Sequence, residues 1–325
     1  MTEPLRILVT GAGGFVGRAL VRALLDQGRL GADGPAIGSV VAVDPHVDVF
    51  ASETRVRAVQ GSLADAGVRA EALRDGVDVA FHLAAVPGGA AEANYALGRD
   101  VNVQATLDLF EALRELPNVP VTVFAGTIAV YGVPLPTDQV DDATPLQPTL
   151  SYGAQKLMME AAISDFTRKG WLDGRAVRLP GIVARPRQPN GLLSAYLSDV
   201  FSALRAGEAY TLPVSPSSTS WFMSLHGVVH NLLHAAALPT AVLPRWRAWN
   251  LPALHLRMDA LVDALAEVLG PSVHARVSYA PNEPLEAQFG RYPPLRTAIA
   301  DRLGFRHDGD AVTLVRHVLA GLEQP

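Results

Sequence analysis

Cysteine is absent from the 325-residue sequence, which excludes disulfide bonds, thiolate catalysis and cysteine-ligated metal sites. No run of about eighteen apolar residues occurs, and the N-terminal residues have the pattern of a strand rather than of a secretion signal. The chain also lacks a long run of one charge sign, and its net charge is -5. We therefore expect no membrane span, no extended nucleic-acid-binding surface and a location in the cytoplasm.

Lysine is nearly absent as well. Lys156 and Lys169 are the only lysines among 27 basic residues, which leaves 25 arginines. An ammonium group is a compact charge whose pKa responds strongly to burial, and a guanidinium group cannot replace it in that role. The scarcity is no argument by itself, but it draws attention to a lysine that falls within a motif.

The sequence begins with a pattern that predicts a buried strand, a tight glycine turn and an amphipathic helix. Residues 6–10 are mostly apolar, and residues 15–27 carry apolar side chains at helical spacing. Of the glycines between them, Gly11 allows the chain to turn, Gly14 lets the backbone approach a phosphate, and Gly17 lets the helix pack on the strand. Because N–H groups at a helix start attract anions, the pattern predicts a dinucleotide-binding turn.

The chain as far as residue 179 alternates strands and helices, which is typical of a doubly wound parallel α/β sheet of the Rossmann type. The predicted strands are residues 40–44, 56–60, 77–83, 121–125 and 176–179. The predicted helices include 94–116 and 151–169, and Ser151 is the expected N-cap of the second. Asp44 ends the second strand, where a carboxylate accepts hydrogen bonds from a ribose and repels a 2′-phosphate. This position favours NAD over NADP. His82, inside the fourth strand, is interpreted as a packed core histidine.

The alternating pattern ends near residue 180, where proline-rich and serine-rich loops follow, together with further predicted helices that include residues 258–269. We therefore expect an NAD-binding Rossmann domain formed by residues 1–179, to which residues 221–252 return. Residues 180–220 and 253–325 are expected to form a smaller, discontinuous substrate-binding lobe.

Three side chains have the chemistry of an alcohol–carbonyl oxidoreductase. Tyr152 and Lys156 are four residues apart, so they share one face of the predicted helix. A free tyrosine titrates near pH ~10, and a neighbouring ammonium group lowers that pKa because it favours the phenolate. Thr127 follows the fifth predicted strand and can hold the same substrate oxygen with its hydroxyl group. Beside a hydride carrier, the pattern predicts that Tyr152 is a general base, that Lys156 lowers the pKa of this base, and that Thr127 holds the substrate hydroxyl group.

Together these motifs resemble the extended short-chain dehydrogenase/reductases, the NAD-dependent epimerase/dehydratase group, over essentially the whole chain. The residues that carry the resemblance are Thr10–Gly17, Asp44, His82–Ala85, Asn102, Val130–Gly132, Tyr152, Lys156 and Arg178–Val183. The resemblance implies that Tyr152 is the catalytic base and that Lys156 binds the nicotinamide ribose. The cofactor contacts that we expect are Gly11, Gly14, Phe15, Val16, Gly17, Asp44, Ser62, Leu63, Leu83, Ala84, Ala85, Asn102, Tyr152, Lys156, Pro180 and Ile182.

The chain departs from the family pattern at two positions. Thr127 stands in the place of the usual catalytic serine, and Ser62 stands in the place of an acid beside the adenine. Residues 128–129 replace the acidic pair of sugar dehydratases, and the cysteine of deoxysugar epimerase-reductases is missing. The segments 178–189 and 215–224 are most similar to a subgroup of dehydrogenases. That subgroup oxidises the 2-hydroxyl group of a four-carbon sugar acid, such as D-erythronate, to the 2-keto acid.

A sugar-acid substrate needs charge-assisted hydrogen-bond donors for its carboxylate. The expected substrate contacts are Thr127, Arg185, Arg187, Asn190, Ser217 and Ser224. His226 and His230 are four residues apart on a predicted helix, but no third ligand has suitable spacing. We therefore expect no metal site, and we interpret these histidines as core or pocket residues.

Two other functions fit parts of the same pattern. A nucleotide-sugar 4-epimerase with bound NAD uses the same tyrosine, lysine and threonine, but residues 212–220 contain no arginine for a pyrophosphate. A non-catalytic NAD-binding protein would tend to lose the tyrosine or the lysine, and both are present. NADH release on addition of substrate separates the dehydrogenase from the epimerase.

Apolar residues on more than one face of two predicted helices indicate a homodimer. They are Leu107, Leu109, Phe110, Leu157, Met158 and Met159. In the family that the chain resembles, these two helices form a four-helix dimer interface.

Overall fold

The computed structural model of the protein describes residues 3–186 and 193–322. The chain forms two units, which are described separately below. The first unit comprises Met1–Val130, Leu150–Arg178 and Val229–Trp249, and the second comprises Tyr131–Thr149, Leu179–Val228 and Asn250–Pro325. This division differs from the predicted one mainly at residues 131–149, which belong to the second unit.

Hydrogen bonds explain why residues 131–149 join the second unit. The backbone N–H of Val140 donates to the carbonyl of Pro294, and the N–H of Arg296 donates to the carbonyl of Val140. The Tyr131 hydroxyl lies 2.9 Å from the side-chain oxygen of Asn250. The sequence pattern does not reveal pairings between segments so far apart in the chain.

The first unit is built on a parallel sheet, as the alternating pattern predicts. Within the described residues this sheet has seven strands in the order β10-β6-β5-β4-β1-β2-β3. The strands are β1 (Leu5–Thr10), β2 (Ile37–Asp44), β3 (Val56–Gln60), β4 (Val79–His82), β5 (Val121–Thr127), β6 (Asp173–Leu179) and β10 (Ala248–Asn250). β1 lies at the reversal of strand order, and its carboxyl end therefore opens into the crevice where ligands bind in such sheets.

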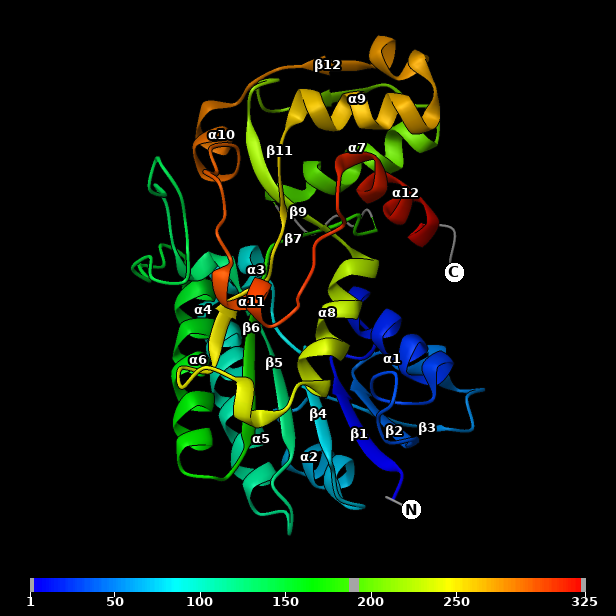
Figure 1. The fold of residues 1–325 in the computed structure, drawn as a ribbon, viewed down its shortest axis with the longest axis vertical. Coiled ribbons are helices and arrows are strands. Elements are labelled where there is room, and N and C mark those ends of the chain that lie inside the picture. Colours follow the sequence, from blue (N-terminus) through cyan, green and yellow to red (C-terminus); the bar gives the residue numbers. More distant parts are fainter. Residues whose placement is uncertain (1–2, 187–192, 323–325) are drawn as a thin grey trace. The chain divides into compact units, whose positions relative to one another are not determined.

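Helices cover both sides of this sheet, with α5 and α6 on one side and α1 and α8 on the other (Figure 1). Their bounds are α1 (Phe15–Gln27), α2 (Ala66–Leu73), α3 (Gly88–Ala93), α5 (Ala105–Arg114), α6 (Ser151–Arg168) and α8 (Leu225–Ala237). Side chains of α2, α5 and α6 form one core cluster with the strands, because their apolar residues recur at helical spacing. Among the described residues, no helix has the length and apolar composition to cross a membrane.

The single helix predicted over residues 94–116 is divided into three segments. α4 (Tyr95–Gly98) leads into a π-helical turn (Arg99–Gln104), and α5 follows. The π-helical turn carries Asn102, which is buried. Such turns recur at functional sites. The long helix predicted over residues 94–116 is therefore present from Tyr95 to Arg114, and hydrophobic spacing did not reveal the π-helical turn inside it.

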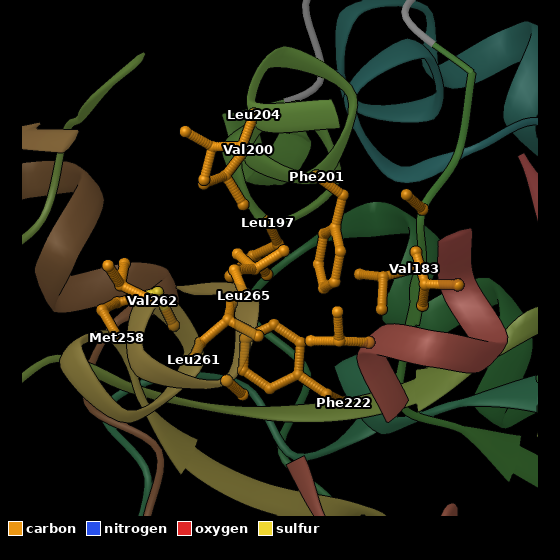
Figure 2. Packing of buried hydrophobic residues seen from close by; sticks show 14 of the residues in the cluster. Val183, Leu197, Val200, Phe201, Leu204, Phe222, Met258, Leu261, Val262 and Leu265 are labelled. Carbon is orange, nitrogen blue, oxygen red and sulfur yellow. The ribbon is translucent and has the colours of Figure 1, made fainter. Parts of the chain in front are cut away.

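The second unit has its own core. α7 (Tyr196–Arg205) and α9 (Met258–Leu269) direct apolar side chains toward each other, with Phe222 of β9 beside them (Figure 2). The remaining elements are β7 (Gly181–Val183), β8 (Tyr210–Leu212), β9 (Thr219–Ser224), β11 (Leu254–Arg257), β12 (Val277–Tyr279), α10 (Glu283–Phe289), α11 (Ala298–Arg302) and α12 (Ala311–Gly321). β11, β9 and β7 form one small sheet, and β12 and β8 form another. The residues on α9 recur at positions i, i+3, i+4 and i+7, which is why this helix was predicted with its observed bounds.

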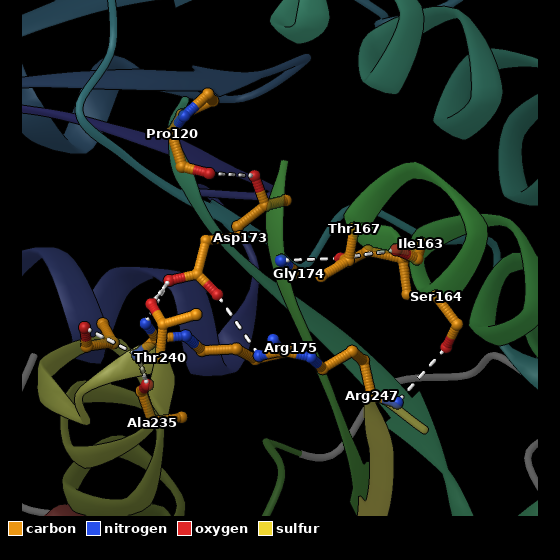
Figure 3. Close-up of polar contacts among 12 residues, drawn as sticks. Pro120, Ile163, Ser164, Thr167, Asp173, Gly174, Arg175, Ala235, Thr240 and Arg247 are labelled. Atoms are coloured by element: carbon orange, nitrogen blue, oxygen red, sulfur yellow. Dashed lines mark hydrogen bonds and ion pairs between the residues drawn. The ribbon is translucent and has the colours of Figure 1, made fainter. Parts of the chain in front are cut away.

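A buried ionic network stabilises the amino end of β6 (Figure 3). The Asp173 carboxylate bonds to Arg175 at 2.7 Å, to the Thr240 hydroxyl at 2.5 Å and to Arg247 at 3.3 Å. The Arg175 guanidinium also donates to the carbonyls of Ala235 and Ala236 at the end of α8. One carboxylate therefore joins β6, the end of α8 and the segment before β10.

We expect Asp173→Asn to lower the free energy of unfolding by about 3–5 kcal/mol, because it leaves the buried Arg175 charge without its counter-ion. Denaturant titration measures this loss. Asp165→Asn is the matched control, since it breaks the exposed Asp165–Arg168 pair, and such pairs contribute about 0–1 kcal/mol. Equal losses in the two variants would contradict the role of the network.

Candidate active site

The glycine turn after β1 is closely packed on the first unit's own backbone. Gly11 has φ +70°, and a Cβ atom there would lie 2.6 Å from the backbone nitrogen of Ala84. A Cβ atom on Gly17 would lie 2.1 Å from the Gly11 carbonyl oxygen. Only glycine fits at these two positions, which allows α1 to begin directly above the carboxyl end of β1.

Gly14 differs from its two neighbours in the motif. It is exposed, its φ is −75°, and a Cβ atom there would meet only the Gly11 carbonyl oxygen, at 3.2 Å. The fold therefore does not by itself require glycine at this position. Gly14 is also the N-cap of α1 and provides no side-chain oxygen for the N–H groups of the first turn. Exposed backbone at an uncapped helix start fits the pyrophosphate of a dinucleotide.

The residues that we expect near the adenosine lie at the ends of β2 and β3. Asp44 is half-buried, and its Oδ1 accepts the His46 N–H at 2.9 Å, which fixes the orientation of the carboxylate. Ser62 is exposed and accepts the Ala64 N–H at 3.2 Å, whereas Leu63 is 7% exposed. An oriented carboxylate at the end of β2 fits the ribose diol of NAD.

The loop after β4 is held by a buried amide. The Asn102 Oδ1 accepts the Val86 N–H at 2.7 Å, and its Nδ2 donates to the Val86 carbonyl at 3.0 Å and to Gln155 at 2.8 Å. Leu83, Ala84 and Ala85 precede Val86 and are half-buried. Asn102 thus fixes the backbone that carries these three expected cofactor contacts.

His82 is a core residue, as the sequence predicts. Its side chain is 1% exposed and lies 2.6 Å from the Thr10 hydroxyl and 2.9 Å from the Thr106 hydroxyl. Burial, together with the charge of Lys156, lowers the pKa of His82 to about 3. His82 is therefore neutral at physiological pH, and its low basicity and its burial exclude it as the base that accepts a proton from substrate.

The three predicted catalytic residues lie on β5 and α6 of the first unit. The Lys156 Nζ lies 4.5 Å from the centre of the Phe124 ring and 5.9 Å from the centre of the Tyr152 ring. The Thr127 Oγ1 accepts the Ala129 N–H at 3.1 Å, so its own proton can be donated to a ligand. Lys156 is 2% exposed and Thr127 is 8% exposed, whereas Tyr152 is half-buried.

The start of α6 differs from the prediction. Ser151 was expected to be the N-cap, but Leu150 has that position and makes no side-chain cap. The Ser151 N–H instead donates to the Glu92 carboxylate of α3 at 2.7 Å. An acid from another helix replaces the local cap and places Tyr152 in the first turn of α6.

Burial lowers the pKa of Lys156 to about 7, and the negative charge of Glu160 opposes the decrease. Glu160 is itself fully buried and pairs with Arg178 of β6 at 2.8 Å. The sequence analysis did not include Glu160 among the functional residues. Its position four residues after Lys156 was the available signal, because it continues the spacing from Tyr152 to Lys156.

Other expected site residues belong to the second unit. Pro180 is buried, Ile182 is 3% exposed in β7, and Arg185 is exposed. Arg187 and Asn190 lie outside the described residues. His226 and His230 are exposed, so they are not core residues.

The serines of the second unit have partners within it. Ser217 is exposed, and its hydroxyl lies 3.1 Å from that of Ser215. Ser224 is fully buried, bonds to Asp308 at 2.5 Å and accepts the Gly227 N–H. In residues 3–186 and 193–322, no group of three or more histidine or acidic side chains is placed to hold a metal ion.

Residues 7–224 match the NAD dependent epimerase/dehydratase family. The chain belongs to this family. D-erythronate dehydrogenase from Cupriavidus necator is 36% identical over 96% of this chain and 97% of its own length. D-erythronate dehydrogenase from Haemophilus influenzae is 30% identical over 97% of this chain and 99% of its own. The crystal structure of a nucleoside-diphosphate-sugar epimerase from Agrobacterium tumefaciens superposes with a TM-score of 0.89. The two sequences are 30% identical, and the superposition covers 98% of this chain and 96% of the epimerase chain.

Membership of the epimerase/dehydratase family confirms the resemblance and the Rossmann fold that the motifs predicted, and NAD is the cofactor named by the family. The geometry of the glycine turn and the orientation of Asp44 fit the anionic pyrophosphate and the ribose of this cofactor. In the first unit these residues are accompanied by a buried lysine and a half-buried tyrosine.

We expect Gly14→Ala to weaken NAD binding by at least about tenfold and to lower the melting temperature only slightly, because the new methyl group has one tight contact in the fold, with the Gly11 carbonyl oxygen at 3.2 Å. Gly17→Ala should instead lower stability by about 1–3 kcal/mol or more, since its Cβ collides with the Gly11 carbonyl. Titration calorimetry and thermal unfolding separate the two effects.

Gly321→Ala is the control, because a Cβ atom there has no neighbour within 4 Å. NAD affinity of the wild-type value in Gly14→Ala would show that the pyrophosphate does not approach this glycine.

Proposed function

We propose that this protein is an NAD-dependent dehydrogenase that oxidises the 2-hydroxyl group of D-erythronate, or of a closely similar sugar acid, to the 2-keto acid. The observation that carries the proposal is the near full-length similarity to two relatives that bear the name D-erythronate dehydrogenase. The buried Lys156 beside the Tyr152 ring supports the chemistry.

In this reaction Tyr152 is the general base. Its phenolate takes the proton of the substrate hydroxyl, while the Thr127 hydroxyl donates to the same oxygen and orients it. When bound, NAD⁺ supplies the acceptor for the hydride that leaves the substrate carbon. Lys156 favours the phenolate because a buried ammonium group gains most from a neighbouring anion.

The cofactor contacts proposed for the first unit are Gly11, Gly14, Phe15, Val16, Gly17, Asp44, Ser62, Leu63, Leu83, Ala84, Ala85, Asn102, Tyr152 and Lys156, and the second unit adds Pro180 and Ile182. For the substrate carboxylate, Arg185 and Arg187 are the proposed cations, since a guanidinium group binds carboxylates through paired N–H donors. Thr127, Asn190, Ser217 and Ser224 are the proposed polar contacts. Arg185 is separated from β7 by Ala184 alone and is exposed, as a ligand-binding cation must be.

A nucleotide-sugar 4-epimerase is the second candidate function. It is supported by the 30% identity and TM-score of 0.89 with a structure named nucleoside-diphosphate-sugar epimerase. The same base, lysine and hydroxyl residue would serve that reaction, but its NAD would remain bound and no NADH would appear. A non-catalytic NAD-binding protein is the remaining alternative, and the presence of Tyr152, Lys156 and Thr127 argues against it.

We also propose that the protein is a cytoplasmic homodimer that associates through a four-helix interface. Met158 of α6 is 46% exposed, and Tyr95 and Leu97 of α4 are 59% and 45% exposed. Leu109, Phe110 and Met159 belong to the core instead, so they do not contribute. An exposed apolar group on two neighbouring helices fits burial against a second copy.

The test of the function is spectrophotometric. Purified protein is mixed with NAD⁺ or NADP⁺ and with C3 to C6 sugar acids or UDP-sugars, and the absorbance of the reduced cofactor is followed. Reduction of NAD⁺ by D-erythronate supports the dehydrogenase. Interconversion of a nucleotide sugar without NADH release supports the epimerase, and tight NAD binding without turnover supports the non-catalytic protein.

We expect Tyr152→Phe to lower turnover by about 10²–10⁴-fold with little change in NAD affinity, because it removes the base and keeps the ring. Steady-state kinetics and NAD titration measure the two quantities. Tyr279→Phe on β12 is the control and should retain full turnover. Undiminished turnover in Tyr152→Phe would exclude this tyrosine as the base.

Met158→Glu should convert the dimer into a monomer at micromolar concentration, because a carboxylate buried in an apolar interface costs several kcal/mol. Sedimentation or light scattering measures the mass. Val242→Glu, at a 51% exposed apolar residue of a loop, is the control and should leave the mass unchanged. A wild-type mass that is already monomeric contradicts the proposed assembly.

A further inference from the structure

A line of ionisable side chains extends from the proposed base into the core of the first unit. Tyr152, Lys156 and Glu160 succeed one another at four-residue spacing, so they share one face of α6. Exposure falls along this line, from a half-buried Tyr152 to 2% for Lys156 and 0% for Glu160. The last member is therefore a carboxylate without contact to water.

Glu160 is held in place by a paired contact from β6. The Arg178 Nε lies 3.0 Å from Oε1, and its Nη2 lies 2.8 Å from Oε2, in the fork geometry of a guanidinium–carboxylate pair. Arg178 is 1% exposed. Burial raises the pKa of Glu160, and the charges of Arg178 and Lys156 oppose this rise without cancelling it. The paired contact with Arg178 is what favours the ionised carboxylate at this buried place.

The carboxylate also reaches the strand that carries the hydroxyl holder. A Cβ atom on Gly126 would lie 3.1 Å from the Glu160 Oε1 and 3.1 Å from the Val177 carbonyl. Gly126 directly precedes Thr127 in β5. Glu160 thus lies where α6, β5 and β6 meet, beneath the residues that form the proposed active site.

The stability of the fold alone does not explain why Glu160 and Arg178 form an ion pair in the core of the first unit. Removing two charges from water is costly, and replacing a buried pair by apolar side chains of similar volume is often neutral or stabilising. A buried lysine, in contrast, needs a fixed anion nearby to remain charged. Lys156 needs a counter-ion, and the Glu160–Arg178 pair can provide one. This explains an ion pair at a place where apolar side chains would pack equally well.

We propose that Glu160, oriented by Arg178, is a positioning residue for the catalytic centre, because its carboxylate keeps Lys156 protonated beside Tyr152. This role adds a residue to the proposed function, and only its expected effect on turnover rests on that function. The effect on Lys156 is a property of the fold and does not depend on the substrate.

The groups that face Lys156 from each neighbouring element agree with this role. On α6 they are Tyr152 and Glu160, and β4 contributes His82, which is neutral. β5 contributes the uncharged Phe124 ring. Arg178 of β6 is a cation, and its guanidinium group forms an ion pair with Glu160. Of these groups only Glu160 is an anion before Tyr152 loses its proton.

The composition of the chain makes a direct test possible, since Lys156 and Lys169 are its only lysines. Full-length protein labelled with [ε-¹³C]lysine gives two signals, of which the exposed Lys169 is an internal reference. A pH titration by NMR, with and without saturating NAD⁺, then reports the protonation midpoint of Lys156. The pH profile of kcat/KM for NAD⁺ reduction is recorded in parallel.

We expect Glu160→Gln to lower the Lys156 midpoint by about one pH unit, since it removes the opposite charge one turn away on the same buried face of α6. With less ammonium present, the phenolate loses stabilisation, and the acid limb of kcat/KM moves to higher pH. Activity at pH 7 should fall about tenfold and recover toward pH 9. Asp165→Asn removes an exposed carboxylate from the same helix and should change neither midpoint nor profile.

Glu160→Gln leaves Arg178 buried without its partner and is expected to be less stable. The double variant Glu160→Gln/Arg178→Met removes both charges and should fold, with the same downward shift of the Lys156 midpoint. A midpoint equal to that of the wild type in the double variant would overturn the proposal, and a loss of melting temperature alone would assign the pair a purely structural role.

Failure of the proposed function gives a different result. If no sugar acid reduces NAD⁺ but the Lys156 midpoint falls in the variants, the substrate assignment is wrong and the role of Glu160 stands. If the sugar acid is oxidised and the midpoint does not move, the dehydrogenase stands and Glu160 has no effect on the lysine.

Discussion

The burial of one ammonium group organises the first unit. Lys156 lies against the Phe124 ring and is 2% exposed, and its charge therefore depends on anions placed near it within the protein. Around it, α6 supplies Tyr152 and Glu160, β5 supplies Thr127, and β6 supplies Arg178. The sheet and the helix are needed together, because neither alone would surround the lysine.

The proposed cofactor site depends on the close approach of backbone segments to one another. Gly11 and Gly17 allow β1, the loop after β4 and α1 to approach within distances that no side chain would permit. Gly14 is exposed, and it leaves the backbone at the start of α1 without a side-chain cap. Asn102 completes the arrangement, because its amide fixes the loop from a π-helical turn.

Local sequence patterns predict much of this structure. The spacing of apolar residues predicts α1, β3 and α9 with their observed bounds, and the glycine motif and the Tyr152–Lys156 pair place the proposed site. What local patterns cannot predict depends on distant partners. The π-helical turn at residues 99–104, the Glu92 contact at the start of α6 and the position of residues 131–149 all result from segments far apart in sequence.

The order of strands has a consequence for the chain as it leaves the ribosome. β6 ends at residue 179, but its neighbour β10 begins at residue 248, after a long part of the second unit. Until that strand has been synthesised, one side of β6 offers unpaired backbone groups, a known template for aggregation. A fragment that stops near residue 180 would keep the glycine turn, Tyr152 and Lys156, and would still present an incomplete sheet edge.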